Sequence, residues 1–292
     1  MLQEYGKWPE SAWTGGEAIW KSAKKITGGA DVGTTSTQVA ILADGALCGF
    51  ANIRTGYDFK AAADKAFALA LGNSGLKASD FSGIFATGFG RRNAVYATGT
   101  TDEVLAHAKG ARFLYGKDVN TVVDLGGQTV KAVRLYDWDR VQEFKISDKC
   151  ATGFGRHIEV LCDLLEVPIT EIGEKSLQVE TDPEPVSTTC YNFAFPETVG
   201  LFRHGYKEEV YSENDVLATH LFTVAWRVLG TVGKLCPLDI GDISVYKELG
   251  FTGGLAKNPG VTKRIERKLG VTALTSEYDP ALAGAIGAAL LA

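Results

Sequence analysis

Two short acidic turns carry the first chemistry that the sequence offers. The segments Asp31-Val-Gly-Thr-Thr35 and Asp124-Leu-Gly-Gly-Gln128 each follow a short apolar run. Glycine lets backbone amides approach phosphate oxygens, and an aspartate at a strand end can help to hold Mg²⁺, which prefers one or two carboxylates with waters and phosphate oxygens. One such turn is equally typical of an ordinary tight turn. Two of them, together with Thr252-Gly-Gly-Leu-Ala-Lys-Asn258, predict a phosphate site.

The cysteines offer a second chemistry. Cys150 and Cys190 lie outside apolar runs, whereas Cys48, Cys162 and Cys236 lie in apolar stretches that favour a buried, inert thiol. A 4Fe-4S cluster usually takes four thiolates, so two ligands from one chain would form half of a site. From the residues alone both interpretations stay open, because cysteine is among the most commonly buried residues.

These groups need elements to position them, and the chain alternates strand and helix patterns. Residues 28–53 predict a strand, the first acidic turn, a second strand, a hairpin turn at Asp44-Gly45 and a third strand. From residue 121 onward this order repeats. The expected helices cover 59–73, 103–115, 153–166, 214–235 and the segments that follow the caps Asn258-Pro259 and Asp279-Pro280.

A short repeat links the two halves. Ala86-Thr-Gly-Phe-Gly-Arg91 recurs unchanged as Ala151-Thr-Gly-Phe-Gly-Arg156. The copies lie at different distances from the aspartates before them, so a simple duplication does not explain them. Either both are glycine turns that lead into helices, or both are anion-facing loops.

Together these motifs resemble those of a known superfamily. The two acidic turns and Gly253-Gly-Leu-Ala-Lys-Asn258 are similar to the phosphate-1, phosphate-2 and adenosine motifs of the superfamily that contains actin, the sugar kinases and acetate kinase. Asp148-Lys-Cys-Ala-Thr-Gly-Phe-Gly-Arg156 and Ser187-Thr-Thr-Cys190 resemble the cysteine segments of the ATPases that activate 2-hydroxyacyl-CoA dehydratases and of the ATPase subunits of benzoyl-CoA reductase. The likeness runs from about Gly28 to the C-terminus.

The resemblance implies an α/β fold of the two-lobed, actin-like (ribonuclease H-like) ATPase type. It implies an N-terminal extension at residues 1–27, a first lobe at 28–115 and a second lobe at 116–278. The C-terminal helix, 279–292, can pack with the first lobe, since its Ala and Gly residues suit close packing.

The resemblance also implies roles for single residues. Asp31 and Asp124 would position Mg²⁺ and the attacking water, with Gln128 assisting. Cys150 and Cys190 would hold half of a 4Fe-4S cluster that a second, homologous ATPase subunit shares. The other residues expected to bind ATP are Gly33, Thr34, Thr35, Gly126, Gly127, Gly253, Gly254 and Asn258. One position departs from the family pattern. The phosphate-2 motif of activators resembles Asp-Ile-Gly-Gly-Gln-Asp, and this chain has Thr129 in place of the last aspartate.

The implied function is ATP hydrolysis that drives low-potential electrons from a ferredoxin-like donor to catalytic iron–sulfur subunits. Residues 1–27 favour a subunit of benzoyl-CoA reductase. The alternatives are an activator of a 2-hydroxyacyl-CoA dehydratase and a sugar kinase of the same superfamily, which would hold no iron. A transcriptional regulator of this fold would need a DNA-binding segment, for which 27 residues of near-neutral charge are too few.

The N-terminal 27 residues carry Trp8, Trp13 and Trp20, three of the five tryptophans of the chain. Exposed aromatic residues of this kind favour interfaces. The alternative is a loosely ordered tail, because chain termini are often mobile.

Composition narrows the class of protein. The 292 residues, 45% of them hydrophobic, can fill two cores. A net charge of −5 leaves no basic footprint for nucleic acid. No apolar run reaches membrane-spanning length and no signal peptide is visible, so we expect a cytoplasmic protein without membrane contact.

Overall fold

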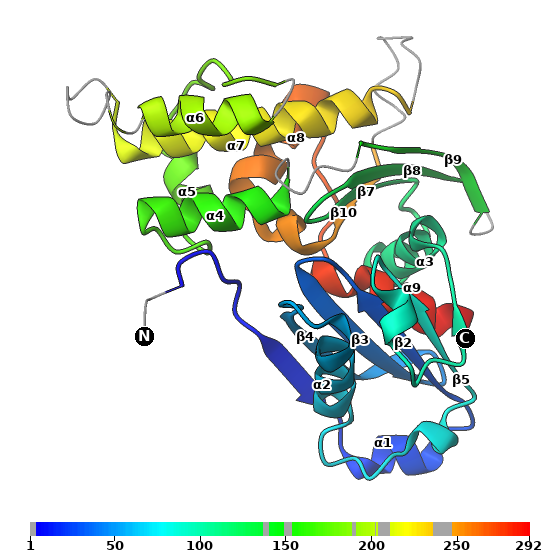
Figure 1. Cartoon of the computed structure of the whole chain (residues 1–292). Helices are drawn as coiled ribbons and strands as arrows, with labels where there is room; N and C mark the ends of the chain where they lie inside the picture. The colour runs from blue at the N-terminus through cyan, green and yellow to red at the C-terminus, as the bar shows by residue number, and fades with distance from the viewer. Residues whose placement is uncertain are drawn as a thin grey trace.

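A computed structural model describes residues 4–136, 140–148, 154–188, 191–201, 203, 211–235 and 247–292. Two β-sheets lie one above the other, each with its own helices (Figure 1). We call the six-stranded sheet with α1, α2 and α9 the lower lobe, and the four-stranded sheet with α4 to α8 the upper lobe. Helix α3 lies between them. The mixed α/β fold with two lobes agrees with the fold class expected from the sequence.

The lower sheet has the strand order β1-β4-β3-β2-β5-β6. Its centre is an antiparallel hairpin meander, β2-β3-β4, and β5 pairs with β2 in parallel. Asp44 and Gly45 both have positive φ and form the predicted turn between β3 and β4. The strands are β1 (Ser11–Thr14), β2 (Ile26–Val32), β3 (Ser36–Ala43), β4 (Ala46–Arg54), β5 (Gly83–Thr87) and β6 (Gly99–Thr100).

Helices cover both faces of the lower sheet, α2 on one side and α9 on the other (Figure 1). Asp58 and Asp102 begin α2 and α3, since each carboxylate accepts a hydrogen bond from a backbone amide of the first turn. Gly29 lets α9 approach β2, because a Cβ there would lie 1.9 Å from the carbonyl oxygen of Ala285. The helices are α1 (Glu17–Ser22), α2 (Phe59–Leu71), α3 (Glu103–Tyr115) and α9 (Ala283–Leu291).

The upper sheet repeats this arrangement in the order β10-β7-β8-β9. Strands β7, β8 and β9 form an antiparallel meander, and β10 pairs with β7 in parallel, as β5 does with β2. The elements are β7 (Thr121–Leu125), β8 (Val130–Tyr136), β9 (Arg140–Ile146), α4 (Gly155–Leu165), α5 (Ile172–Leu177), α6 (Tyr191–Gly200), α7 (Glu213–Val232), β10 (Leu249–Thr252) and α8 (Pro259–Leu269).

The strands and helices expected from the sequence are present at nearly the expected bounds. The sequence patterns missed β1, β5, β6, α1 and α5, which are two to six residues long, and the ten-residue α6, which contains Pro196. The lobe boundaries at 27, 115 and 278 stay a prediction. Helix α3 illustrates why, because its side chains pack both on the upper sheet and on α9. Within the described part of the chain, no helix is long and apolar enough to cross a membrane.

Candidate active site

A cavity of about 240 Å³ lies between the two lobes. Its wall includes both acidic turns, the start of the 253–258 segment and residues 7–10 of the N-terminal segment. Most residues that the sequence assigned to nucleotide binding or catalysis therefore face one space. The members of that set that line the cavity are Asp31, Gly33, Thr34, Thr35, Asp124, Gly126, Gly127, Gln128, Gly253 and Gly254.

The two acidic turns have the same backbone geometry. The amide of Gly33 donates to the carbonyl oxygen of Ser36 at 3.0 Å, and the amide of Gly126 donates to that of Thr129 at 3.1 Å. A Cβ on either glycine would lie within 2.8 Å of the oxygen that its turn contacts, so a side chain fits neither position. Each turn joins the first two strands of its meander. The two lobes therefore share not only their strand arrangement but also the backbone conformation of these turns.

The turns also meet across the cavity. Gly127 lies against the side chain of Thr35, whose Oγ1 would be 2.6 Å from a Cβ at Gly127. An anion bound in this cavity would contact both lobes at once. Binding there therefore favours a closed arrangement of the lobes, provided that the open arrangement binds the anion less well.

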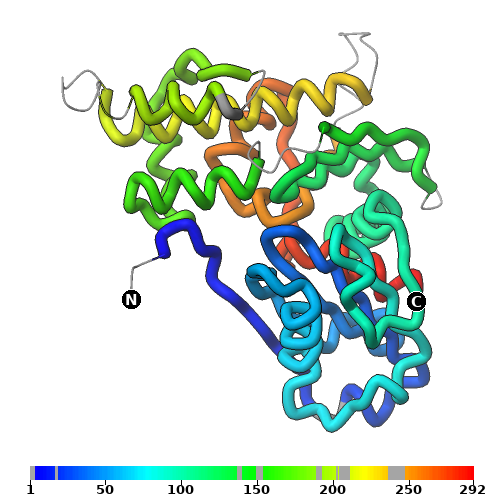
Figure 2. Tube along the Cα trace, in the orientation of Figure 1, coloured from blue at the N-terminus to red at the C-terminus, as the bar shows by residue number. Residues whose placement is uncertain are grey.

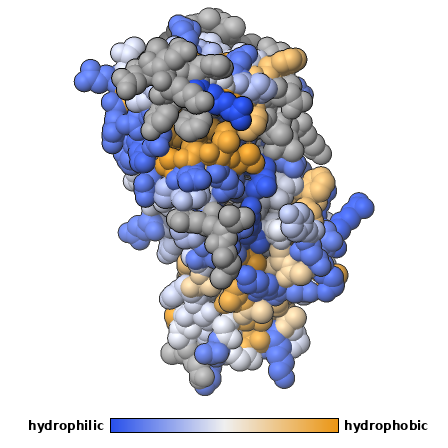
Figure 3. All heavy atoms as spheres, turned by 60° about the vertical axis from the view of Figure 1, so that its left-hand side comes forward, coloured by the Kyte–Doolittle hydropathy of each residue, from blue (hydrophilic) through white to orange (hydrophobic). Residues whose placement is uncertain are grey.

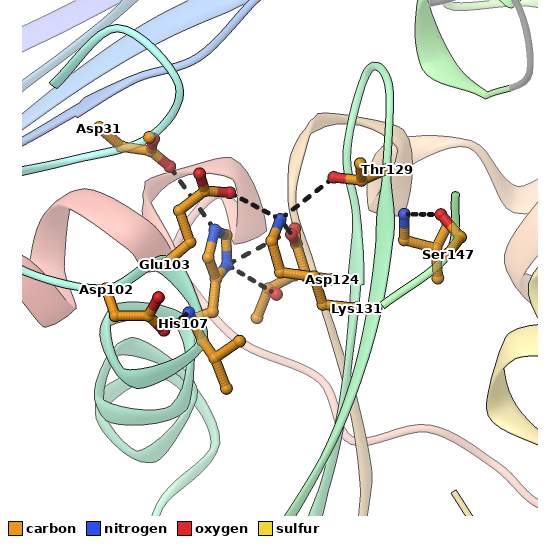
Figure 4. A network of polar contacts seen from close by, with 12 residues as sticks. Asp31, Asp102, Glu103, His107, Asp124, Thr129, Lys131 and Ser147 are labelled. Carbon is orange, nitrogen blue, oxygen red and sulfur yellow. Dashed lines mark hydrogen bonds and ion pairs between the residues drawn. The ribbon is translucent and has the colours of Figure 1, made fainter. Parts of the chain in front are cut away.

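His107, on α3, lies between the two turn aspartates (Figure 4). Its Nε2 is 3.6 Å from Oδ2 of Asp31, and its Nδ1 is 3.5 Å from Oδ1 of Asp124. Nδ1 also shares a hydrogen bond of 3.0 Å with Oγ1 of Thr252. Burial disfavours the charged imidazole, but the carboxylates outweigh burial and raise the pKa of His107.

A buried lysine neutralises Asp124 from the other side. Lys131, on β8, is 6% exposed and donates to Oδ2 of Asp124 at 2.8 Å. Glu103 contacts the same ammonium at 2.9 Å. Burial works against both charges, yet the ion pairs prevail, so the pKa of Lys131 is raised and that of Asp124 is lowered. In the described residues no lysine or arginine ion pair is found for Asp31, so the two aspartates differ in their charge surroundings.

The third predicted segment, residues 253–258, lies at the end of β10. Gly253 has φ of +87°, and a Cβ there would be 2.5 Å from Oδ1 of Asp124, so only glycine fits. Lys257 forms an ion pair of 3.1 Å with Asp279. Asn258 is buried, and the nitrogen and oxygen of its side-chain amide have no hydrogen-bond partner among the described residues. Asn258 is not part of the cavity wall, so its assignment to nucleotide binding stays a prediction.

The first copy of the hexapeptide repeat is the lower-lobe counterpart of that segment. Gly88 also has φ of +87°, and a Cβ there would be 2.4 Å from Oδ1 of Asp31. In the parallel strand pairs, Thr87 is aligned with Asp31, and Thr252 with Asp124. The second copy falls partly outside the described residues and ends in the first turn of α4. The structural repeat thus pairs 86–91 with 251–256 rather than with 151–156.

The start of α4 is bonded to the second acidic turn. The amides of Gly155 and Arg156 donate to the carbonyl oxygens of Gly126 and Gly127, at 3.3 and 3.1 Å. The first amides of a helix have no hydrogen-bond acceptor within the helix. Here two carbonyl oxygens of the turn accept their hydrogen bonds. The start of α4 is therefore fixed to the predicted phosphate site.

The two predicted metal ligands, Cys150 and Cys190, lie outside the described residues. Cys48 and Cys162 are buried in the cores of the lower and upper lobes, respectively. Burial raises the pKa of both thiols, for Cys162 to about 12. Their burial agrees with the interpretation of the sequence, and Cys236 lies outside the described residues. Among the described residues, no three His, Cys, Asp or Glu side chains are grouped to hold a metal ion by themselves.

Sequence reasoning missed His107, Lys131 and Glu103. For Lys131 a signal was present, because a charged residue inside the apolar strand Val130–Tyr136 needs a buried partner. For His107 the signal was weaker: a single histidine in a helix rich in alanine, preceded by Asp102 and Glu103. Nothing in the local pattern indicated that these side chains reach Asp124.

Comparisons with known proteins agree with this geometry. The family model described as "BadF/BadG/BcrA/BcrD ATPase family" matches residues 29–292. An activator of lactoyl-CoA dehydratase from Anaerotignum propionicum is 37% identical over 268 residues, which cover 90% of this chain and 96% of the relative. A benzoyl-CoA reductase subunit from Thauera aromatica is 30% identical, covering 91% of this chain and 92% of the relative.

Solved structures show the same likeness. The (R)-2-hydroxyglutaryl-CoA dehydratase component A of Acidaminococcus fermentans is 30% identical with a TM-score of 0.79, covering 92% of this chain and 98% of its own. The activator of the 2-hydroxyisocaproyl-CoA dehydratase from Clostridium difficile with bound ADPNP is 28% identical with a TM-score of 0.78, covering 91% and 94%.

Proposed function

Because the chain belongs to the BadF/BadG/BcrA/BcrD ATPase family, we propose that it is an ATP-hydrolysing activator of a 2-hydroxyacyl-CoA dehydratase. The sequence patterns alone favoured a subunit of benzoyl-CoA reductase. The comparisons support the alternative better, since the activator from A. propionicum is 37% identical and the reductase subunit 30%. Both of the similar solved structures described above are also dehydratase activators or components.

In this proposal the two turns hold the phosphates of ATP, and the two aspartates have different roles. Asp31 faces the cavity without a lysine or arginine ion pair in the described structure, so it can share Mg²⁺ with phosphate oxygens and water. Asp124 is paired with Lys131, which fixes the carboxylate beside the second turn. Gln128 lines the cavity, where it can orient the attacking water.

A single observation carries the link between ATP and electron transfer. The first amides of α4 are bonded to the carbonyl oxygens of the second turn. Cys150 lies five residues before Gly155, the first residue of this helix. A change in the turn when ATP is hydrolysed would therefore move the start of α4, and with it the cysteine segment.

We assign Cys150 and Cys190 to a 4Fe-4S cluster shared with a second, homologous subunit. Each cysteine precedes a helix, α4 at Gly155 and α6 at Tyr191, and the positive ends of helix dipoles favour a negatively charged group. Arg227 donates to the carbonyl oxygens of Ser187 and Thr188, three and two residues before Cys190. These surroundings fit the group, which would accept and pass on one electron at a time.

The partners in this proposal are a ferredoxin-like electron donor and a catalytic iron–sulfur dehydratase. Apolar side chains such as Val160 and Leu164 on α4 are exposed. Figure 3 brings the left-hand side of Figure 1 forward, and it shows apolar surface among hydrophilic residues in the upper half of the molecule. Apolar surface of this kind is typical of protein contacts.

The test is to purify the protein without oxygen and to measure iron content and ATP hydrolysis on the same sample. We expect a brown protein in which Cys150→Ser and Cys190→Ser each lose iron but keep ATP binding. Cys48→Ser is the matched control, because this buried thiol belongs to the lower core. Normal iron in either variant would refute the ligand assignment, and a colourless wild-type ATPase would favour a kinase.

A further inference from the structure

The N-terminal segment crosses from one lobe to the other. Figure 2 shows it running from α4 of the upper lobe down to the lower sheet. At its start, Gly6 donates to Oδ1 of Asp163 at 2.8 Å, and the amide of Ile169 donates to the carbonyl oxygen of Tyr5 at 2.9 Å. At its end, residues 11–14 form β1, which pairs with β4. The extension is therefore part of both lobes, which decides against a loosely ordered tail for residues 4–14.

Both ends of this crossing are tightly fixed. Gly6 lies so close to α4 that a Cβ would be 2.0 Å from the carbonyl oxygen of Glu159. The carboxylate of Glu10 accepts from the amide of Arg54 and from the ammonium of Lys65, both at 3.1 Å. The backbone between these two anchors, residues 7–9, therefore has little conformational freedom.

Residues 7–9, between the anchors, and Glu10 itself line the cavity between the lobes. Trp8 is half-buried against the core of the upper lobe. The ammonium of Lys257 lies 4.9 Å from the centre of its ring, a cation–π distance. Lys257 is also held by Asp279 at 3.1 Å. The indole thus lies beside the segment 253–258, at the part of the cavity that the turns do not form.

We propose that Trp8 is a nucleoside-binding residue of the ATP site, where its ring stacks on the base. This inference rests on the proposed function, since it needs ATP in the cavity. The phosphates occupy the turns at 33–36 and 126–129, so the base must extend to another wall. Residues 253–255 provide one side of that wall, and Trp8, whose ring lies beside Lys257 of the same segment, provides the other. Trp8 precedes residue 29, where the family model begins.

The experiment compares two probes on one set of variants. Binding of a non-hydrolysable ATP analogue and of magnesium tripolyphosphate is measured for the wild type, Trp8→Ala and Trp8→Phe. Stacking of a base on an aromatic side chain contributes enough that Trp8→Ala should bind the analogue roughly 5- to 100-fold more weakly. Tripolyphosphate has no base, so its affinity should stay unchanged. Trp8→Phe keeps an aromatic face and should recover most of the affinity for the analogue.

Trp13→Ala is the matched control, because Trp13 belongs to the same segment but is exposed beside Phe50 and does not line the cavity. It should bind both probes like the wild type. Equal affinity of Trp8→Ala and wild type for the analogue would overturn the inference, and so would equal losses for both probes. A wild type that binds tripolyphosphate and no analogue would also overturn it. A wild type that binds neither probe would instead contradict the proposed function.

Discussion

The two acidic turns share one backbone and differ in their charges. Asp31 and Asp124 end equivalent strands, and Gly88 and Gly253 press against them in the same conformation. Asp124, however, is paired with the buried Lys131, whereas Asp31 contacts only His107 among the described cations. In our proposal the repeat of the fold supplies two phosphate turns. The side chains around them hold one aspartate in a buried ion pair and leave the other available to a metal.

The anchored turn is also the one that holds α4. Gly126 and Gly127 accept hydrogen bonds from the first amides of that helix. At the first turn the corresponding bond, from the amide of Gly90 to the carbonyl oxygen of Val32 at 2.8 Å, comes from the cap of a three-residue 3₁₀ helix, and no described α-helix begins there. In the proposed function the upper turn transmits a change at the phosphates to the start of α4, which follows Cys150 in the sequence. In the same proposal the lower turn, with Asp31, binds Mg²⁺. Four predictions test this division.

The largest expected effect is on catalysis at the lower turn. Asp31→Asn should lower ATP hydrolysis by about 10²–10³-fold, because positioning and electrostatic stabilisation supply most of phosphoryl-transfer catalysis. The free energy of unfolding should fall by about 1 kcal/mol or less. Steady-state hydrolysis and denaturant unfolding measure the two effects. Asp64→Asn, exposed on α2, is the control, and wild-type hydrolysis in Asp31→Asn would show that this turn is structural.

The upper turn should respond differently. Asp124→Asn should also abolish most hydrolysis, but it should lower the free energy of unfolding by about 3 kcal/mol, because a buried cation loses its main partner. Adding Lys131→Met should restore much of that stability without restoring hydrolysis. Denaturant unfolding of the single and double variants measures this. If Asp124→Asn unfolds like Asp31→Asn, the proposed difference between the turns is wrong.

The two glycines behind the aspartates permit a matched comparison. Alanine at positive φ costs about 1–3 kcal/mol, and in both places Cβ would meet a carboxylate oxygen. Gly253→Ala should cost more than Gly88→Ala, because Lys131 prevents Asp124 from moving aside. Thermal and denaturant unfolding measure the ranking. The reverse order would mean that Asp31 is the more tightly held carboxylate.

The smallest expected effect concerns His107 and pH. Its pKa is raised above the ordinary value of 6.5, so the stability that its charge provides is complete below that value and is lost as pH rises through the raised pKa. The difference in unfolding free energy between wild type and His107→Gln should therefore be larger near pH 6 than near pH 9, by about 1 kcal/mol. Asp124 does not change charge between pH 6 and pH 9, because its pKa is lowered and the stability that its charge provides is lost only in acid. An equal difference at both pH values would contradict a charged His107.

Much of this arrangement was predictable from the sequence. Alternating apolar residues and the turn at Asp44-Gly45 indicated the lower meander, because these are local signals. The glycines of both turns indicated two similar turns for the same reason, and both turns line one cavity, whereas their binding of phosphate stays a prediction. The contacts of Asp124 were not predictable, since they depend on α3, β8 and β7 meeting in space. Trp8 was visible as an aromatic residue, but its place in the cavity follows from the crossing between the lobes.

The most direct test of the account is electron transfer in a single turnover. Protein reduced with dithionite is mixed with a 2-hydroxyacyl-CoA dehydratase, with and without ATP, and the electron that reaches the dehydratase is counted by its iron–sulfur spectrum. We predict transfer in the wild type only when ATP is added. The Asp124→Asn variant should accept an electron from dithionite and keep it after ATP is added. Transfer at the wild-type rate in that variant, or equally fast transfer without nucleotide, would contradict coupling through the second turn.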